Sequence, residues 1–134
     1  MPNRQQKDRS HRFGKLQLRI MRLLWRQRMN ARAITDELNS ERSEAQTAHS
    51  TVQTLLRKLE EKGAISHEVK ERTFIFYPLV REENAMQKAT QDFVQRIFNG
   101  SVPGLVSYLL KSEKLSPDEL REIRKLVQEK GKVK

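Results

Sequence analysis

The hydrophobic pattern of this chain changes from a helical to an alternating period at Gly63. Before Gly63 the apolar residues recur every three or four positions, which is typical of amphipathic helices. After it, Ile65, His67 and Val69 alternate with polar neighbours, and the next apolar run is β-branched and aromatic, which favours strands. Three helices followed at once by a hairpin predict a winged helix-turn-helix domain, mainly α with a small β-hairpin.

The elements of this domain have recognisable starts and stops. Helices are expected over residues 15–28, 31–38 and 47–62, a polar loop over 39–44 and a hairpin over 65–78 with its turn at 70–72. Asn30 and Thr47 are the expected N-caps of the second and third helices. Gly63 is the expected stop, because glycine readily adopts the positive φ of a helix C′ residue. Phe74 and Phe76 share one strand face and are expected in the core.

Three further amphipathic helices are expected behind the hairpin, over residues 81–99, 101–110 and 116–130. The last begins with Ser116, Pro117 and Glu119 in the order of a capping box with an N1 proline. Exposed, the apolar residues of these helices would exceed the few hundred Å² of patch that soluble monomers tolerate. We therefore expect a helical dimerisation segment, with contacts from Met86, Ala89, Phe93, Ile97, Leu105, Leu109, Leu120, Ile123 and Val127.

Positive charge is concentrated at the front of the chain. Residues 1–35 contain ten Lys or Arg and one Asp, a net charge of +9. Residues 36–134 contain seventeen basic and sixteen acidic residues, a net of +1, although the whole chain carries +10. A one-sided basic region is the footprint of a polyanion partner, since each neutralised phosphate releases a counterion.

The third helix carries the expected reading surface for double-stranded DNA. Its back is apolar and its front is polar, as a helix in the major groove requires. The side chains expected to contact DNA from this helix are His49, Ser50, Thr51, Gln53, Thr54, Arg57 and Lys58. Gln pairs with adenine, Arg with guanine, and Thr with a base edge or the thymine methyl. Lys70 and Arg72 at the hairpin turn are expected to reach phosphate or the minor groove.

Other classes of protein are disfavoured by what the sequence lacks. The chain has no cysteine, no Gly-rich phosphate loop and no nucleophile motif, and His11, His49 and His67 have no metal-ligand spacing. We therefore expect no enzyme activity, no metal and no cofactor. Without an apolar run of ~18 residues or a signal segment, we expect a cytoplasmic chain without membrane insertion. Two alternatives stay open: a winged-helix protein-interaction adaptor and a non-specific basic nucleic-acid (RNA) binder.

Five segments give the chain a family resemblance. They are residues 16–25 (LQLRIMRLLW), 50–63 (STVQTLLRKLEEKG), 72–78 (RTFIFYP), 93–100 (FVQRIFNG) and 115–120 (LSPDEL). With them the chain resembles the BlaI/MecI family of penicillinase repressors over residues 15–130. The resemblance implies a homodimeric repressor of a palindromic promoter operator, with Thr51 and Thr54 on the base-reading face and Arg57 extending it.

The resemblance also implies how such a repressor is released. Family members are inactivated by proteolysis in the dimerisation domain, here residues 81–130, on a signal from a membrane-bound β-lactam sensor protease. The best-known members have an Asn-Phe cleavage pair where this chain has Ser107 and Tyr108. The absence of cysteine argues against copper sensing. The basic arm, residues 1–14, is an addition to the family pattern; we expect it to be disordered and to add phosphate or minor-groove contacts.

Overall fold

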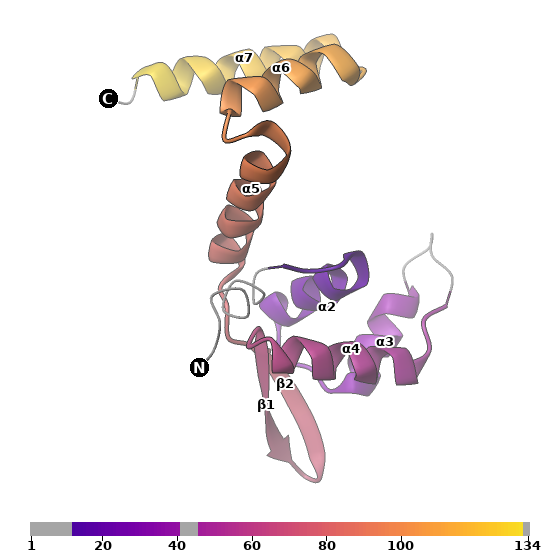
Figure 1. Cartoon of the computed structure of the whole chain (residues 1–134). Helices are drawn as coiled ribbons and strands as arrows, with labels where there is room; N and C mark the ends of the chain where they lie inside the picture. The colour runs from indigo at the N-terminus through magenta and orange to yellow at the C-terminus, as the bar shows by residue number, and fades with distance from the viewer. Residues whose placement is uncertain (1–11, 41–45, 133–134) are drawn as a thin grey trace, which may run out of the picture. The chain divides into compact units, whose positions relative to one another are not determined.

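The computed structural model describes residues 12–40 and 46–132 (Figure 1). Within them the chain forms α2 (Lys15–Arg26), α3 (Ala31–Ser40), α4 (His49–Glu61), β1 (Ile65–Lys70), β2 (Thr73–Pro78), α5 (Glu82–Phe98), α6 (Val102–Ser112) and α7 (Pro117–Lys132). The predicted fold class is therefore confirmed. Most of the basic arm, His11 and most of the predicted 39–44 loop lie outside the described residues. The chain divides into two compact units, one ending at Thr90 and one beginning at Gln91.

The first unit has a single apolar core to which its helices and hairpin all contribute. Its buried members are Ile20, Met21, Leu23, Leu24, Met29, Ile34, Leu38, Val52, Leu56, Leu59, Ala64, Ile65 and Phe76. The indole N–H of Trp25 donates to the carbonyl of Val80 at 2.9 Å, and Phe13 packs edge-on against Trp25 with ring centroids 6.4 Å apart. Phe13, although placed in the basic arm by sequence, is therefore part of this packing.

The hairpin is antiparallel and pairs in register from Ile65 opposite Pro78 to Lys70 opposite Thr73. In Figure 1 it projects beyond the three helices of the first unit. Glu71 and Arg72 form its turn, and both have positive φ, 51° and 64°. This is the backbone of a two-residue type I′ turn, whose handedness matches the twist of the strands. The turn therefore holds Arg72 at the tip at a cost in local backbone strain.

The first helix is shorter than predicted, ending at Arg26 rather than at residue 28. The reason lies in Met29, whose backbone joins the hairpin instead: its N–H donates to Phe76 at 3.3 Å and its carbonyl accepts from Phe76 at 2.8 Å. An extended segment thus adds a bridge to the edge of β2. The second helix is longer than predicted and runs to Ser40, so Asn39 and Ser40 are helical rather than part of a loop.

The two predicted N-caps have different outcomes. Asn30 is confirmed, because its Oδ1 accepts the N–H of Ala33 at 2.8 Å. Thr47 is wrong: α4 is preceded by Ala48, without a side-chain cap. The backbone of Thr47 instead meets the side chain of Asn39, which accepts its N–H at 2.7 Å and donates to its carbonyl at 3.0 Å. The predicted stop at Gly63 is confirmed by a φ of 83°.

The prediction that Phe74 belongs to the core is wrong, whereas the one for Phe76 is confirmed. Both side chains share one face of the hairpin, but Phe76 is 8% exposed and Phe74 is 49% exposed. The hairpin runs past the helices at this point, so no core remains for Phe74 to enter. Its ring instead stacks on His67, with centroids 3.9 Å apart and planes 12° apart.

The later helices follow the predicted order with shifted ends. Ser101 caps α6 by accepting the N–H of Gly104 at 2.9 Å, and α6 runs on to Ser112 rather than ending at residue 110. The capping box of α7 is confirmed: the backbone N–H of Glu119 donates to Ser116 Oγ at 3.1 Å, and Oε1 of Glu119 accepts from the Ser116 N–H at 2.9 Å. Gly131 does not close this helix, which continues to Lys132. Among the described residues no helix is long and apolar enough to cross a membrane.

Candidate nucleic-acid interface

Helix α4 has a buried back and an exposed front. Val52, Leu56 and Leu59 are at most 1% exposed and fix the helix on the core. Leu55 is only partly buried, at the edge of the core. The exposed front consists of Ser50, Thr51, Gln53, Thr54, Arg57 and Lys58. Six of the seven predicted contact residues of this helix thus reach solvent, and a rigid core holds them in place.

The hydroxyl of Thr54 is already oriented by its own helix. Its Oγ1 donates to the carbonyl of Ser50 at 3.0 Å. A hydroxyl has a single proton, so against DNA this side chain offers lone pairs and a methyl group rather than a donor. Those features suit an amino group of adenine or cytosine, or the methyl group of thymine.

His49, the remaining predicted contact residue of α4, is partly buried and tied to α3. Its Nδ1 lies 3.1 Å from Oγ1 of the buried Thr35. That hydroxyl donates to the Ala31 carbonyl at 2.8 Å, so the proton of the His49–Thr35 bond must come from Nδ1. The bond fixes the ring and links the start of the reading helix to α3.

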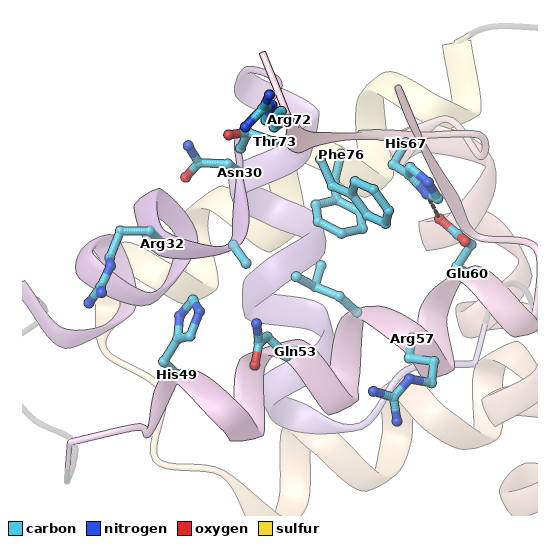
Figure 2. A pocket seen from close by; sticks show the side chains of 13 residues that line it. Asn30, Arg32, His49, Gln53, Arg57, Glu60, His67, Arg72, Thr73 and Phe76 are labelled. Carbon is cyan, nitrogen blue, oxygen red and sulfur yellow. Dashed lines mark hydrogen bonds and ion pairs between the residues drawn. The ribbon is translucent and has the colours of Figure 1, made fainter. Parts of the chain in front are cut away.

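A groove of about 660 Å³ opens between α4, the start of α3 and the hairpin (Figure 2). Among the predicted site residues it brings together His49, Gln53, Arg57 and Arg72. Ser50, Thr51, Thr54 and Lys58 lie on the exposed front of α4 but do not line the groove, and neither does Lys70. The predicted interface therefore has two parts: the front of α4, and the groove beside it that Arg72 closes from the hairpin turn.

The groove contains residues that the sequence analysis did not assign to the site. Asn30 and Arg32, at the start of α3, line it together with His67 and Phe74 of the hairpin. Arg32 was counted only as part of the basic front. It lies two residues after the N-cap Asn30, in the first turn of α3, which lines the groove beside α4.

Two basic residues of the front, Arg19 and Arg28, also make contacts within the domain. Arg28 pairs with Glu68 at 3.0 Å and lies over the ring of Tyr77, with its guanidinium carbon 4.5 Å from the centroid. Arg19 donates to the carbonyl of Leu38 at 3.2 Å. Net charge therefore overstates the number of cations that serve a polyanion partner. Within the described ranges no cluster of three His, Asp or Glu could hold a metal ion.

Comparisons with known proteins agree with this geometry. The family model described as penicillinase repressor matches residues 13–129. The chain is 28% identical to the penicillinase repressor of Bacillus licheniformis over 114 residues, 84% of this chain and 87% of that protein. It is 25% identical to the methicillin resistance regulatory protein MecI of Mammaliicoccus sciuri and 24% identical to MecI of Staphylococcus aureus (strain N315), in each case over 92% of this chain and 98% of the relative.

The match covers the reading helix, the hairpin and the C-terminal helices in one alignment. The family model therefore spans both the winged-helix elements of the first unit and the helices that follow them. The chain therefore belongs to the penicillinase repressor family, the BlaI/MecI family of transcriptional repressors.

Proposed function

We propose that this chain is a homodimeric transcriptional repressor that binds a palindromic promoter operator through its winged helix. The observation that carries the proposal is the front of α4, where six polar or cationic side chains are exposed opposite the buried Val52, Leu56 and Leu59. Arg72 adds a cation at the hairpin turn, beside Arg57 in the lining of one groove. We assign the chain a regulatory rather than an enzymatic role.

In this proposal the front of α4 reads bases and the hairpin contacts the sugar-phosphate backbone. Arg57 is the expected reader of guanine through a bidentate contact, and Thr51 and Thr54 are the expected contacts to adenine or thymine. Lys58, Lys70 and Arg72 are expected to neutralise phosphates, each making binding more sensitive to salt.

Residues 15–80 form the DNA-binding part and residues 81–130 the dimerisation part of the proposed repressor. The support for pairing is exposure of large apolar side chains: Phe93, Ile97, Leu109, Leu120 and Val127 are 42–64% exposed. Leu105 and Ile123 are partly buried within their own unit. A second copy that covered the exposed group would place two reading helices about one DNA turn, roughly 34 Å, or a multiple of it apart.

Release by proteolysis of the C-terminal segment, under a membrane sensor protease, completes the proposal. Ser107 and Tyr108 lie inside α6 and are exposed, Tyr108 by 61%. A protease binds an extended backbone, so α6 must open locally before it is cut; the described residues of α6 include none that is buried, which keeps that opening inexpensive. An immunoblot of host cells after exposure to a β-lactam tests this step, and a chain that stays intact while its genes are induced would contradict it.

The direct test of the proposed function is a binding titration at fixed salt with two DNA probes. One contains the promoter region in front of the protein's own gene, and the other is a shuffled version of it. A specific site is expected to bind ~10³-fold or more tightly than the shuffled DNA, with two protomers per site. Equal affinities that fade steeply with salt would instead favour the non-specific nucleic-acid binder, and no DNA binding would favour the adaptor.

Two variants assign the specificity to α4. Arg57→Ala is expected to lower affinity for the operator by about 10- to 100-fold while leaving binding to shuffled DNA nearly unchanged, since a good bidentate pair is worth ~1–3 kcal/mol. Arg124→Ala removes the same charge from an exposed position of α7 and should change neither. Equal losses from both variants would show that charge alone, rather than base reading, binds this DNA.

A further inference from the structure

The groove beside α4 has two chemically different walls. One is aromatic and apolar: Phe74 and Phe76 approach edge-on at 6.3 Å, His67 stacks on Phe74, and Leu56 also lines the groove. The other is polar and is made of Asn30, His49 and Gln53. Figure 2 shows His67 and Phe76 across the opening from His49 and Gln53. Such a combination of an apolar surface with a few convergent polar groups is the usual composition of a small-molecule site.

The rim of the groove is cationic. Arg32, Arg57 and Arg72 come from α3, α4 and the hairpin turn, and Figure 2 shows them on three different sides of the opening. The acidic group in the lining is Glu60, whose Oε1 lies 2.6 Å from Nδ1 of His67 and is thereby engaged in a hydrogen bond. Three guanidinium groups against one paired carboxylate give the groove a positive potential, which selects anions.

Size agrees with a ligand of moderate dimensions. A volume of about 660 Å³ lies within the roughly 300–1,000 Å³ of ordinary ligand pockets. Phe74 supplies the sharpest observation, because a phenylalanine that is 49% exposed on a hairpin leaves an apolar ring face available to a partner. A DNA phosphate would use the arginines but has no need of a stacked aromatic wall.

From these features we infer that the groove binds a small planar organic anion, such as an aromatic carboxylate. Its ring packs against Phe74 and Phe76, and its carboxylate is held by the rim arginines, chiefly Arg72. Gln53, Arg57 and Arg72 also belong to the proposed DNA interface, so the occupied groove and the operator compete for the same side chains. The regulatory consequence, though not the binding itself, rests on the proposed function: the anion acts as an inducer that needs no proteolysis.

Calorimetry on the full chain without DNA tests the site. The probe is 1-naphthoate; 1-naphthylmethanol has the same ring without the charge, and inorganic phosphate has charge without a ring. Naphthoate is expected to bind at least about tenfold more tightly than either, because naphthylmethanol lacks the charge for the rim arginines and phosphate lacks the ring for the aromatic wall. Phosphate binding as tightly as naphthoate would overturn the inference and leave a phosphate slot for the DNA backbone. Undetectable binding of naphthoate would overturn it outright.

Matched variants locate the ligand. Phe74→Ser and Arg72→Gln are each expected to weaken naphthoate by about tenfold. Val69→Ser is the control: it lies opposite Phe74 in the hairpin and is 64% exposed, but does not line the groove. Phe74, Arg72 and Val69 are all exposed, so none of the three substitutions should disturb the apolar core. If Phe74→Ser binds naphthoate like the unchanged chain, the ligand lies elsewhere and the inference is wrong.

A competition experiment separates this inference from the proposed function. At a naphthoate concentration of about ten times its own Kd, the apparent Kd of the dimer for the operator is expected to rise about 100-fold, because simple competition contributes about tenfold at each of its two grooves. If naphthoate binds the free chain but leaves operator affinity unchanged, the inducer role is wrong. If the chain binds no operator in the first place, the proposed function fails, while calorimetry still decides whether the groove takes an aromatic anion.

Discussion

The two units of this chain place their apolar residues in opposite ways. In the first, thirteen side chains from three helices, the hairpin and the segments between them form one cluster, each at most 9% exposed. In the second, the described residues of α6 and α7 include none that is buried. Many large apolar side chains there are 40% exposed or more, such as Ile97 at 58% and Val127 at 64%.

This difference indicates that the first unit has a core large enough to keep it folded without a partner, whereas the second unit does not. Its helices contact each other and the hairpin, so its stability should not depend on protein concentration. In the second unit many apolar residues instead lie on helix surfaces and are exposed to solvent. Apolar area exposed on this scale is typical of an interaction surface, and we expect a second copy to supply the missing cover.

The largest expected effect is a loss of stability in the first unit, caused by a substitution in its core. Leu56→Ala removes a side chain that is 1% exposed and should lower the free energy of unfolding by about 2–5 kcal/mol, since it leaves a cavity in a packed interior. Urea denaturation followed by Trp25 fluorescence measures it. Leu126→Ala is the matched control, because Leu126 is 59% exposed; an equal loss from both would erase the contrast between the units.

The next effect is on the second unit and should leave the first folded. Leu109→Glu puts a charge on a side chain that is 42% exposed in α6 and that belongs to the proposed dimer contacts. We expect a monomer by light scattering at micromolar concentration and a loss of operator affinity of about 100-fold or more, since each half-site then binds alone. Gln128→Glu on α7 adds the same charge as a control. A Leu109→Glu chain that stays dimeric would place the interface elsewhere.

A smaller effect, and an increase in stability rather than a loss, is expected in the hairpin turn. Glu71 has a φ of 51°, and a left-handed L-residue costs ~1–2 kcal/mol. Asparagine tolerates this conformation better, so Glu71→Asn should raise the free energy of unfolding of the first unit by about 0.5–1 kcal/mol. Lys70→Asn, one residue earlier in β1, should not stabilise. Equal behaviour of the two variants would show that the turn stores no strain.

The smallest expected effect concerns the start of α7. Hydrogen bonds from the Ser116 backbone and hydroxyl hold the pKa of Glu119 below its ordinary value. A lowered pKa in the folded chain means that this cap contributes fully above the ordinary glutamate pKa and is lost as pH falls through the lowered one. The amide resonance of Ser116 should report that titration, and Glu119→Gln should abolish it. Titration of the amide at or above the ordinary pKa of glutamate would contradict the assignment.

Local signals determined much of this protein from the sequence alone. The change of period at Gly63, the cap at Asn30 and the capping box at Ser116 each act within a few residues, and the structure confirms all three. The polar front of α4 was predictable for the same reason, because helical spacing decides which side chains share a face.

Tertiary structure decided what depends on residues distant in the chain. Met29 pairs with Phe76 and thereby ends the first helix early, the backbone of Thr47 bonds the side chain of Asn39 instead of Thr47 capping α4, and Phe74 lies outside the core because the hairpin extends beyond the helices. The groove that joins Arg32, Arg57 and Arg72 has the same origin. The spacing of residues along the chain determines which side chains share a face of a helix or strand. Which of these faces contact one another depends on packing between elements that are distant in the sequence.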